Sequence, residues 1–165
     1  MFTVRQRRRV AMFCAAAGSA AAITLLATPA ASAQPAACQA PGDREAAVET
    51  DDSSCVAESD MGGAAAAYGL GGDAEAVANG QSLALAIAQN GGTATSEAAN
   101  FGGPAAIALG PGATVNMTKT QLGLAIGIAG PGATIDFDGP GAATCSGGAA
   151  FAGDLLTLTG CVSNG

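Results

Sequence analysis

Apolar and polar residues alternate along residues 62–141, and glycine or proline interrupts the alternation about every ten residues. Ala74, Ala76 and Ala78, for example, alternate with Glu75 and Val77. Side chains two residues apart share one face of a β-strand, so this period predicts short strands separated by turns. In these half-polar strands the apolar side chains should point inward and the polar ones toward solvent.

The pattern recurs at an interval of about 20 residues, with Gly71, Gly91, Gly110 and Gly130 at the starts of four units. Each unit reads as a turn, a half-polar strand, a second turn and an apolar strand. Repeats that cannot bury an apolar face alone are typical of solenoids, in which each coil covers the next. We therefore predict an all-β fold, a short β-solenoid-like stack of Gly/Ala-rich repeats around a narrow core.

Two other folds compete with this prediction. A β-meander or β-sandwich can be built from the same strands, because each unit holds two of them. An α-helix is favoured by the 42 alanines, since alanine has the highest helix propensity. Frequent glycine and the two-residue spacing of the large side chains argue for strands. A stack also requires Ile87, Ile107 and Ile126 to lie close together.

The apolar strands carry leucine or isoleucine on one face and alanine on the other. We expect leucine and isoleucine to point into the core, which leaves the alanine face outside. That face has no charge, so we interpret it as a contact surface for the chain's own N-terminal segment, a second copy or an envelope partner. Its residues are Ala66, Ala86, Ala106 and Ala125.

The first 33 residues have the pattern of a secretory signal peptide. A basic start at residues 5–9 precedes an uncharged apolar stretch at residues 10–27, and Ala31-Ser32-Ala33 provides small residues for cleavage before Gln34. We therefore expect residues 1–33 to be a signal peptide, 34–60 an acidic lead-in and N-terminal cap, and 61–165 the β-repeat domain. No later apolar run is long enough to cross a membrane after signal cleavage.

Cysteine usage agrees with export. The four cysteines beyond residue 33 are Cys38, Cys55, Cys145 and Cys161. Four cysteines in a small exported chain suggest two disulfides, with three connectivities to choose from. Spacing favours Cys38–Cys55 and Cys145–Cys161, one short loop at each end of the repeat region.

Residues 34–165 are strongly acidic. They keep thirteen Asp and Glu but only Arg44 and Lys119 of the six basic residues, a formal charge of −11. Such a surface repels nucleic acid, and we expect no nucleic-acid partner. The densest cluster of acidic residues is interpreted either as part of a solvated, partly disordered lead-in or as a Ca²⁺ site. They are Asp43, Glu45, Glu49, Asp51, Asp52, Glu58 and Asp60.

Candidate chemistry is sparse. The chain has no histidine, which excludes Ser-His-Asp and Cys-His sites and histidine metal ligation. Neither a phosphate-binding loop nor a G-x-S-x-G nucleophile turn is present. We expect no enzyme activity and no cofactor, with a small hydrolase that uses two carboxylates as a remote alternative.

Three short strings carry a resemblance: G-P-G-A-T at residues 110–114 and 130–134, and A-I-A-Q-N-G-G at 86–92. Together with the Ala-rich leader and the flanking cysteine pairs, the chain resembles a group of small, uncharacterised exported proteins of high-GC actinobacteria. That resemblance implies no activity. The sequence therefore favours a secreted, acidic structural or interaction protein at the cell envelope or beyond it, with a cation-binding module as the main alternative.

Overall fold

The computed structural model describes residues 34–139 and 141–165, so the expected signal peptide at 1–33 lies outside the described residues. The described chain folds into two seven-stranded sheets without a helix. Sheet A consists, in spatial order, of β1 (Ala36–Pro41), β4 (Ala64–Leu70), β6 (Leu83–Gln89), β8 (Gly102–Leu109), β10 (Gly123–Ala129), β13 (Ala149–Asp154) and β14 (Gly160–Asn164). Sheet B consists of β12 (Thr144–Gly147), β11 (Ala133–Asp138), β9 (Thr114–Lys119), β7 (Thr93–Ala98), β5 (Asp73–Ala78), β3 (Ser54–Ser59) and β2 (Arg44–Glu49).

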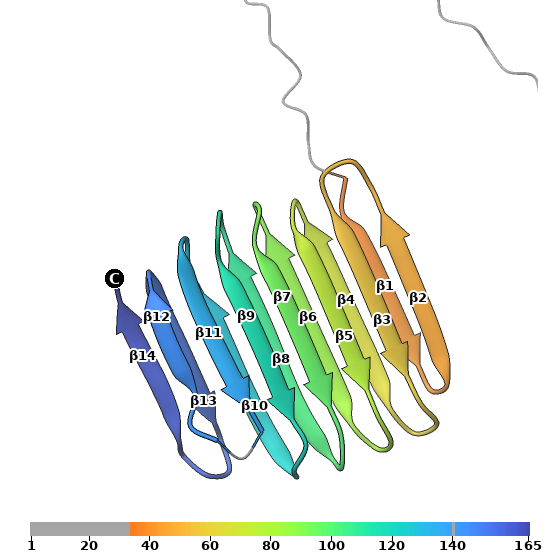
Figure 1. Cartoon of the computed structure of the whole chain (residues 1–165). Helices are drawn as coiled ribbons and strands as arrows, with labels where there is room; N and C mark the ends of the chain where they lie inside the picture. The colour runs from red at the N-terminus through yellow and green to blue at the C-terminus, as the bar shows by residue number, and fades with distance from the viewer. Residues whose placement is uncertain (1–33, 140) are drawn as a thin grey trace, which may run out of the picture. The chain divides into compact units, whose positions relative to one another are not determined.

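From β3 to β11 the chain alternates between the sheets, with one strand in sheet B and the next in sheet A (Figure 1). Strands of successive turns pair in parallel, as β5 does with β7 and β6 with β8. This is the expected all-β, solenoid-like stack, with about four turns. Consecutive antiparallel neighbours, which a meander requires, occur only at the ends. Residues 73–89, where a helix was the competing prediction, form β5 and β6.

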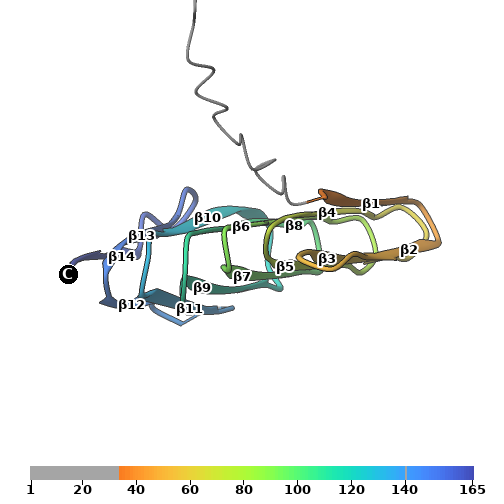
Figure 2. The ribbon, with the colours of Figure 1, turned by 90° about the horizontal axis from the view of Figure 1, so that it is seen from above.

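Seen from above, in a view along the strands, the two sheets lie face to face with the core between them (Figure 2). Antiparallel strands close both ends of the stack. β1 and β2 pair with β4 and β3, and at the other end β13 and β12 pair with β10 and β11. Residues 36–59 therefore form strands rather than a partly disordered lead-in, because Ala36, Cys38 and Ala40 alternate into the core. The boundary at residues 60 and 61 stays a prediction.

The core is narrow and lined mainly by alanine. It widens toward the C-terminal end, where one file of sheet B runs from Ala76 through Ser96 and Met117 to Phe137. Sheet A adapts by becoming smaller: a Cβ added at Gly127 would lie 2.7 Å from the Met117 Sδ. Large and small residues on the facing walls therefore complement one another at close packing.

Pro104 stands inside a central strand, a place where proline is rare because it cannot donate a hydrogen bond to the ladder. The pairing of β6 with β8 begins one residue later, at Leu85 and Ala105. The Pro104 carbonyl oxygen accepts a hydrogen bond of 3.0 Å from the hydroxyl of Ser96, across the core. A buried serine in an otherwise apolar file is thereby satisfied.

The predicted direction of the apolar strands was wrong. Ala86 and Ala106 have 0% exposure and Ala125 has 2%, so these three residues lie inside rather than on an outer face. Leucine and isoleucine point outward instead. Short turns hold the two sheets so close that only alanine or glycine fits between them in most turns, and residue size rather than hydrophobicity decides the orientation.

The strand register explains the position of Ala66, the fourth residue of the predicted alanine face. Ala66 is half-buried on the outer side and pairs in file with Leu85, Ala105 and Ile126. Ala66 pairs with Leu85, 19 residues later, whereas the predicted group places it 20 residues before Ala86. A slip of one residue moves a strand position to the opposite face of the sheet, so Ala66 was grouped with residues that point the other way.

Candidate contact surface

The outward side of sheet A is an extended apolar surface, which we call the apolar face. Leu83 is 60% exposed and Leu124 is 56% exposed, while the isoleucines between them are half-buried by their neighbours. No outward-pointing residue on the seven strands of sheet A is charged. The apolar face comprises Leu83, Leu85, Ile87, Ile107, Leu109, Leu124, Ile126, Ile128, Phe151 and Val162.

A hollow of about 330 Å³ opens on this face between Leu83 and Leu124. Its floor contains Gly103 and Pro104. A Cβ at Gly103 would lie 2.5 Å from a methyl carbon of Leu124, so a larger residue at this position would have to displace the Leu124 side chain. The side chain of Leu124 thus lies over the backbone of β8, and the face is uneven enough to receive a protruding apolar group.

Phe101 marks the rim of a neighbouring hollow that Leu83 and Leu124 also line. It is 59% exposed and has a φ of 65°, directly after Asn100 with a φ of 48°. Asparagine tolerates the left-handed region, but a phenylalanine there costs about 1 kcal/mol or more. A strained, exposed aromatic residue beside an apolar surface is consistent with a role in contact rather than in folding.

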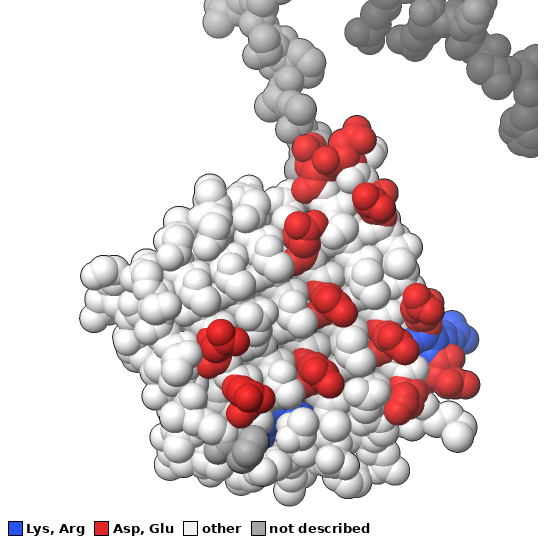
Figure 3. Space-filling model, viewed as in Figure 1, with Lys and Arg blue, Asp and Glu red and all other residues white. Residues whose placement is uncertain are grey.

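The outward side of sheet B is acidic (Figure 3). Its carboxylates stand among threonine and asparagine residues on every strand from β2 to β11 except β9. They are Glu45, Glu49, Glu58, Asp73, Glu75, Glu97, Asp136 and Asp138. The molecule therefore presents one uncharged apolar side and one negatively charged side.

The acids between residues 43 and 60 do not form one cluster, although Glu45 and Glu58 are cross-strand partners. Glu45, Glu49 and Glu58 project from β2 and β3, while the others lie in the turns. Asp60 accepts a hydrogen bond from the backbone N–H of Gly80. Among the described residues, no three acidic or other ligating side chains are placed to hold a metal ion together.

Sequence reasoning missed a buried ion pair. Lys119 from β9 and Asp154 from β13 form the one salt bridge found among the described residues, and both side chains are 2% exposed. The Oδ1 atom of Asp154 also accepts the backbone N–H groups of Leu156 and Thr157, at 2.8 and 3.1 Å. The signal was available, because Lys119 follows Val115 and Met117 at the inward two-residue spacing.

Burial by itself would raise the pKa of the Asp154 carboxyl. The hydrogen bond from the Lys119 ammonium and those from Thr157 and Leu156 outweigh it and bring that pKa below its ordinary value. Asp154 is therefore ionised at neutral pH and Lys119 is its counter-ion. A protonated, paired amine has no free lone pair, so this lysine is poorly suited to act as a nucleophile or base.

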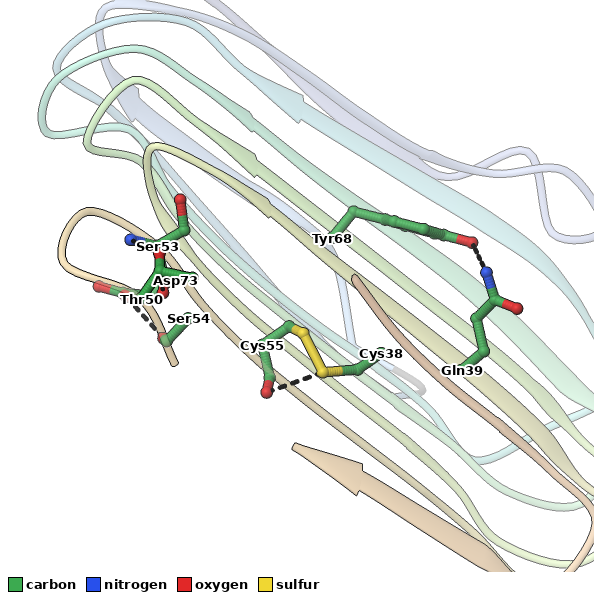
Figure 4. The surroundings of a disulfide bond; sticks show 8 residues. All are labelled: Cys38, Gln39, Thr50, Ser53, Ser54, Cys55, Tyr68 and Asp73. Carbon is green, nitrogen blue, oxygen red and sulfur yellow. Dashed lines mark hydrogen bonds between the residues drawn. A yellow bond between two sulfur atoms is a disulfide. The ribbon is translucent and has the colours of Figure 1, made fainter. Parts of the chain in front are cut away.

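Two disulfides join the sheets at the ends of the stack. Cys38–Cys55 links β1 to β3 beside the Gln39–Tyr68 hydrogen bond (Figure 4), and Cys145–Cys161 links β12 to β14. These are the pairs that the spacing favoured. Disulfides form and persist in oxidising compartments, so the pairs fit an extracellular protein. The described part of the chain has no helix that is long and apolar enough to span a membrane.

Fold and surface together define a disulfide-capped, solenoid-like β-protein with one apolar and one acidic side. The chain belongs to a family of unknown function, DUF6764, whose model matches residues 2–164. Comparisons with curated proteins and with solved structures found no match. Family membership therefore brings no activity with it, and the functional argument depends on the surface described above.

Proposed function

We propose that this protein is a secreted, non-catalytic contact protein of the cell envelope or extracellular space, and that its apolar face is the surface through which it works. The observation that carries the proposal is the absence of charged side chains on the outward side of sheet A, in a chain that is otherwise strongly acidic. Soluble monomers seldom expose a continuous apolar patch larger than a few hundred Å² without using it for contact.

Export is supported by the two disulfides and by the leader pattern of residues 1–33. A non-catalytic role is supported by the chemistry at hand. The chain has no histidine, and the only lysine of the described residues is buried in an ion pair. The carboxylates of sheet B lie among threonine and asparagine side chains on its outward side, without a histidine or lysine beside them.

A photo-cross-linking amino acid tests the contact surface without a named partner. Benzoylphenylalanine placed at Ile87, on the apolar face, should yield covalent adducts when cells producing the full chain are irradiated. The same group at Thr95, on the outward side of sheet B, is the matched control and should yield few. Equal adducts from both positions, or none from Ile87, would contradict the proposal.

A further inference from the structure

We infer that the occupant of the apolar face is the same face of a second copy, so that two molecules pack sheet A against sheet A. This inference rests on the proposed function, because it names the partner for the surface proposed there. Its observations are the size of the face, the distribution of charge and the treatment of the sheet edges.

The size of the face matches what a stable dimer needs. Sheet A has seven strands of five to eight residues, and strands about 4.8 Å apart with residues about 3.3 Å apart give a face of about 700 Å². A standard protein interface buries about 800 Å² on each partner. One copy of this sheet can therefore cover one other copy almost completely.

Charge permits this partner. The outward positions of sheet A carry no charged side chain, so nothing ionic has to be desolvated. Stacked sheets lie about 10 Å apart, which would put the two acidic surfaces about 30 Å from each other, on opposite outsides. That is nearly four Debye lengths of about 8 Å at physiological ionic strength, so their repulsion is largely screened. An anionic bilayer would instead face a chain with a formal charge of −11 over residues 34–165, which opposes adsorption.

The arrangement also closes. A contact of one surface with itself is a two-fold contact, which is complete with two copies. Sheet B presents carboxylates, and its edge strand β2 carries Arg44, Glu45 and Glu49. Charged and short edge strands discourage further pairing, and β12 at the other edge has only four residues. The account thus predicts dimers rather than fibres.

β8 is the central strand of sheet A, and Ile107 points outward from it. A two-fold axis near the centre of the face would place Ile107 against its own copy. β7 is likewise central in sheet B, with Thr95 pointing outward. The two positions form a matched pair on opposite sides of the molecule.

The test is the mass in solution of the oxidised protein lacking residues 1–33, by sedimentation equilibrium and light scattering. The wild-type protein should have twice the chain mass. Ile107→Glu should weaken association at least about a hundredfold, because two carboxylates would be buried face to face, while Thr95→Glu should remain dimeric. A monomeric wild-type protein, or equal behaviour of the two variants, would overturn the inference.

A second measurement keeps the inference testable if Ile107→Glu does not fold. With the native disulfides kept oxidised, Ile107→Cys should form a disulfide between two copies, and intact mass spectrometry would report a doubled mass. Thr95→Cys should form no such disulfide. No such product from a folded Ile107→Cys protein would also overturn the inference. The two proposals can fail separately. If the protein is a monomer but the cross-linker at Ile87 still reacts with another molecule, the inferred dimer is wrong and the proposed contact surface stands.

Discussion

At the scale of single residues, Lys119 occupies a core position that alanine fills in the preceding turns. It pairs in file with Ala98, which pairs with Ala78, and all three are buried. The aliphatic stem of lysine fills volume where the core widens, and the ammonium group is neutralised by Asp154. Because an unpaired buried charge is costly, the two residues have to be treated as one unit.

Removing one member of this pair should destabilise the protein far more than removing both. Lys119→Met is expected to lower the free energy of unfolding by about 3–5 kcal/mol at neutral pH, since the Asp154 carboxylate stays buried without a counter-ion. The double variant Lys119→Met/Asp154→Asn should recover most of the loss, because the asparagine Oδ1 can still accept the N–H groups of Leu156 and Thr157. Urea unfolding of the three proteins measures both effects.

The same pair predicts a dependence on pH. Asp154 has a pKa below its ordinary value in the fold, so the pair contributes fully above about pH 4 and its contribution is lost as the pH falls through the folded-state pKa. In Lys119→Met, burial without a neighbouring cation should raise the pKa of Asp154. Protonation of Asp154 at low pH then removes the cost of an unpaired buried carboxylate. The stability gap between wild type and variant should therefore narrow on acidification; a constant gap would contradict the assignment.

At the scale of elements, the ends of the stack depend on the disulfides. β1 and β2 at one end and β12 and β14 at the other are edge strands, each with a neighbour on one side only. Each bridge ties an edge strand of one sheet to a strand of the other. Closing a loop of this length stabilises a fold by about 3 kcal/mol, which is large beside the small apolar area that each alanine buries.

The two bridges should differ in how readily they are reduced. Cys38 and Cys55 are each 1% exposed, whereas Cys145 and Cys161 are half-exposed. Under native conditions a mild thiol reductant should therefore open Cys145–Cys161 first, which alkylation and peptide mass mapping would report. In denaturant, where neither bridge is shielded, both should react at similar rates. Earlier reduction of Cys38–Cys55 in the native protein would show that the N-terminal end opens more easily than its burial indicates.

Strands were easier to predict than their orientation. In sheet B, alanine or larger apolar residues alternate with Glu75, Thr95 and Asp136, so polarity alone points each strand correctly. Units that start at Gly91 and Gly110 would place Ala94 opposite Ala113, whereas Ala94 pairs with Val115 in the structure. A difference of two residues leaves the side chain on the same face of the strand. In sheet A both faces are apolar, and alternation of alanine with isoleucine carries no polarity difference to orient the strand.

What orients sheet A is the distance between the sheets, which no local pattern encodes. The inward spacing of Lys119 was readable in the sequence, but its partner was not, because Lys119 of sheet B and Asp154 of sheet A are brought together only in the folded chain. The contact surface was anticipated as an uncharged face of the apolar strands, but it consists of the leucines and isoleucines rather than of Ala86, Ala106 and Ala125.

At the scale of the whole molecule, sheet A turns its small side chains inward and its large apolar ones outward, and sheet B presents an acidic surface on the opposite side. This arrangement makes the apolar face available for contact and leaves stability to the hydrogen-bonded ladders, the close packing of alanine and the two disulfide-bonded ends. Both the proposed function and the inferred dimer depend on that ordering of layers.

Neighbouring residues of β8 test the ordering most directly. Ala106 points between the sheets and Ala105 points out beside Leu85 and Ile126, so the same substitution samples opposite sides of one strand. Thermal and urea unfolding should show that Ala106→Leu lowers the free energy of unfolding by about 2 kcal/mol or more through overpacking, while Ala105→Leu changes it by less than about 1 kcal/mol. A tolerated Ala106→Leu beside a strongly destabilising Ala105→Leu would mean that the large residues form the core and that no apolar face exists.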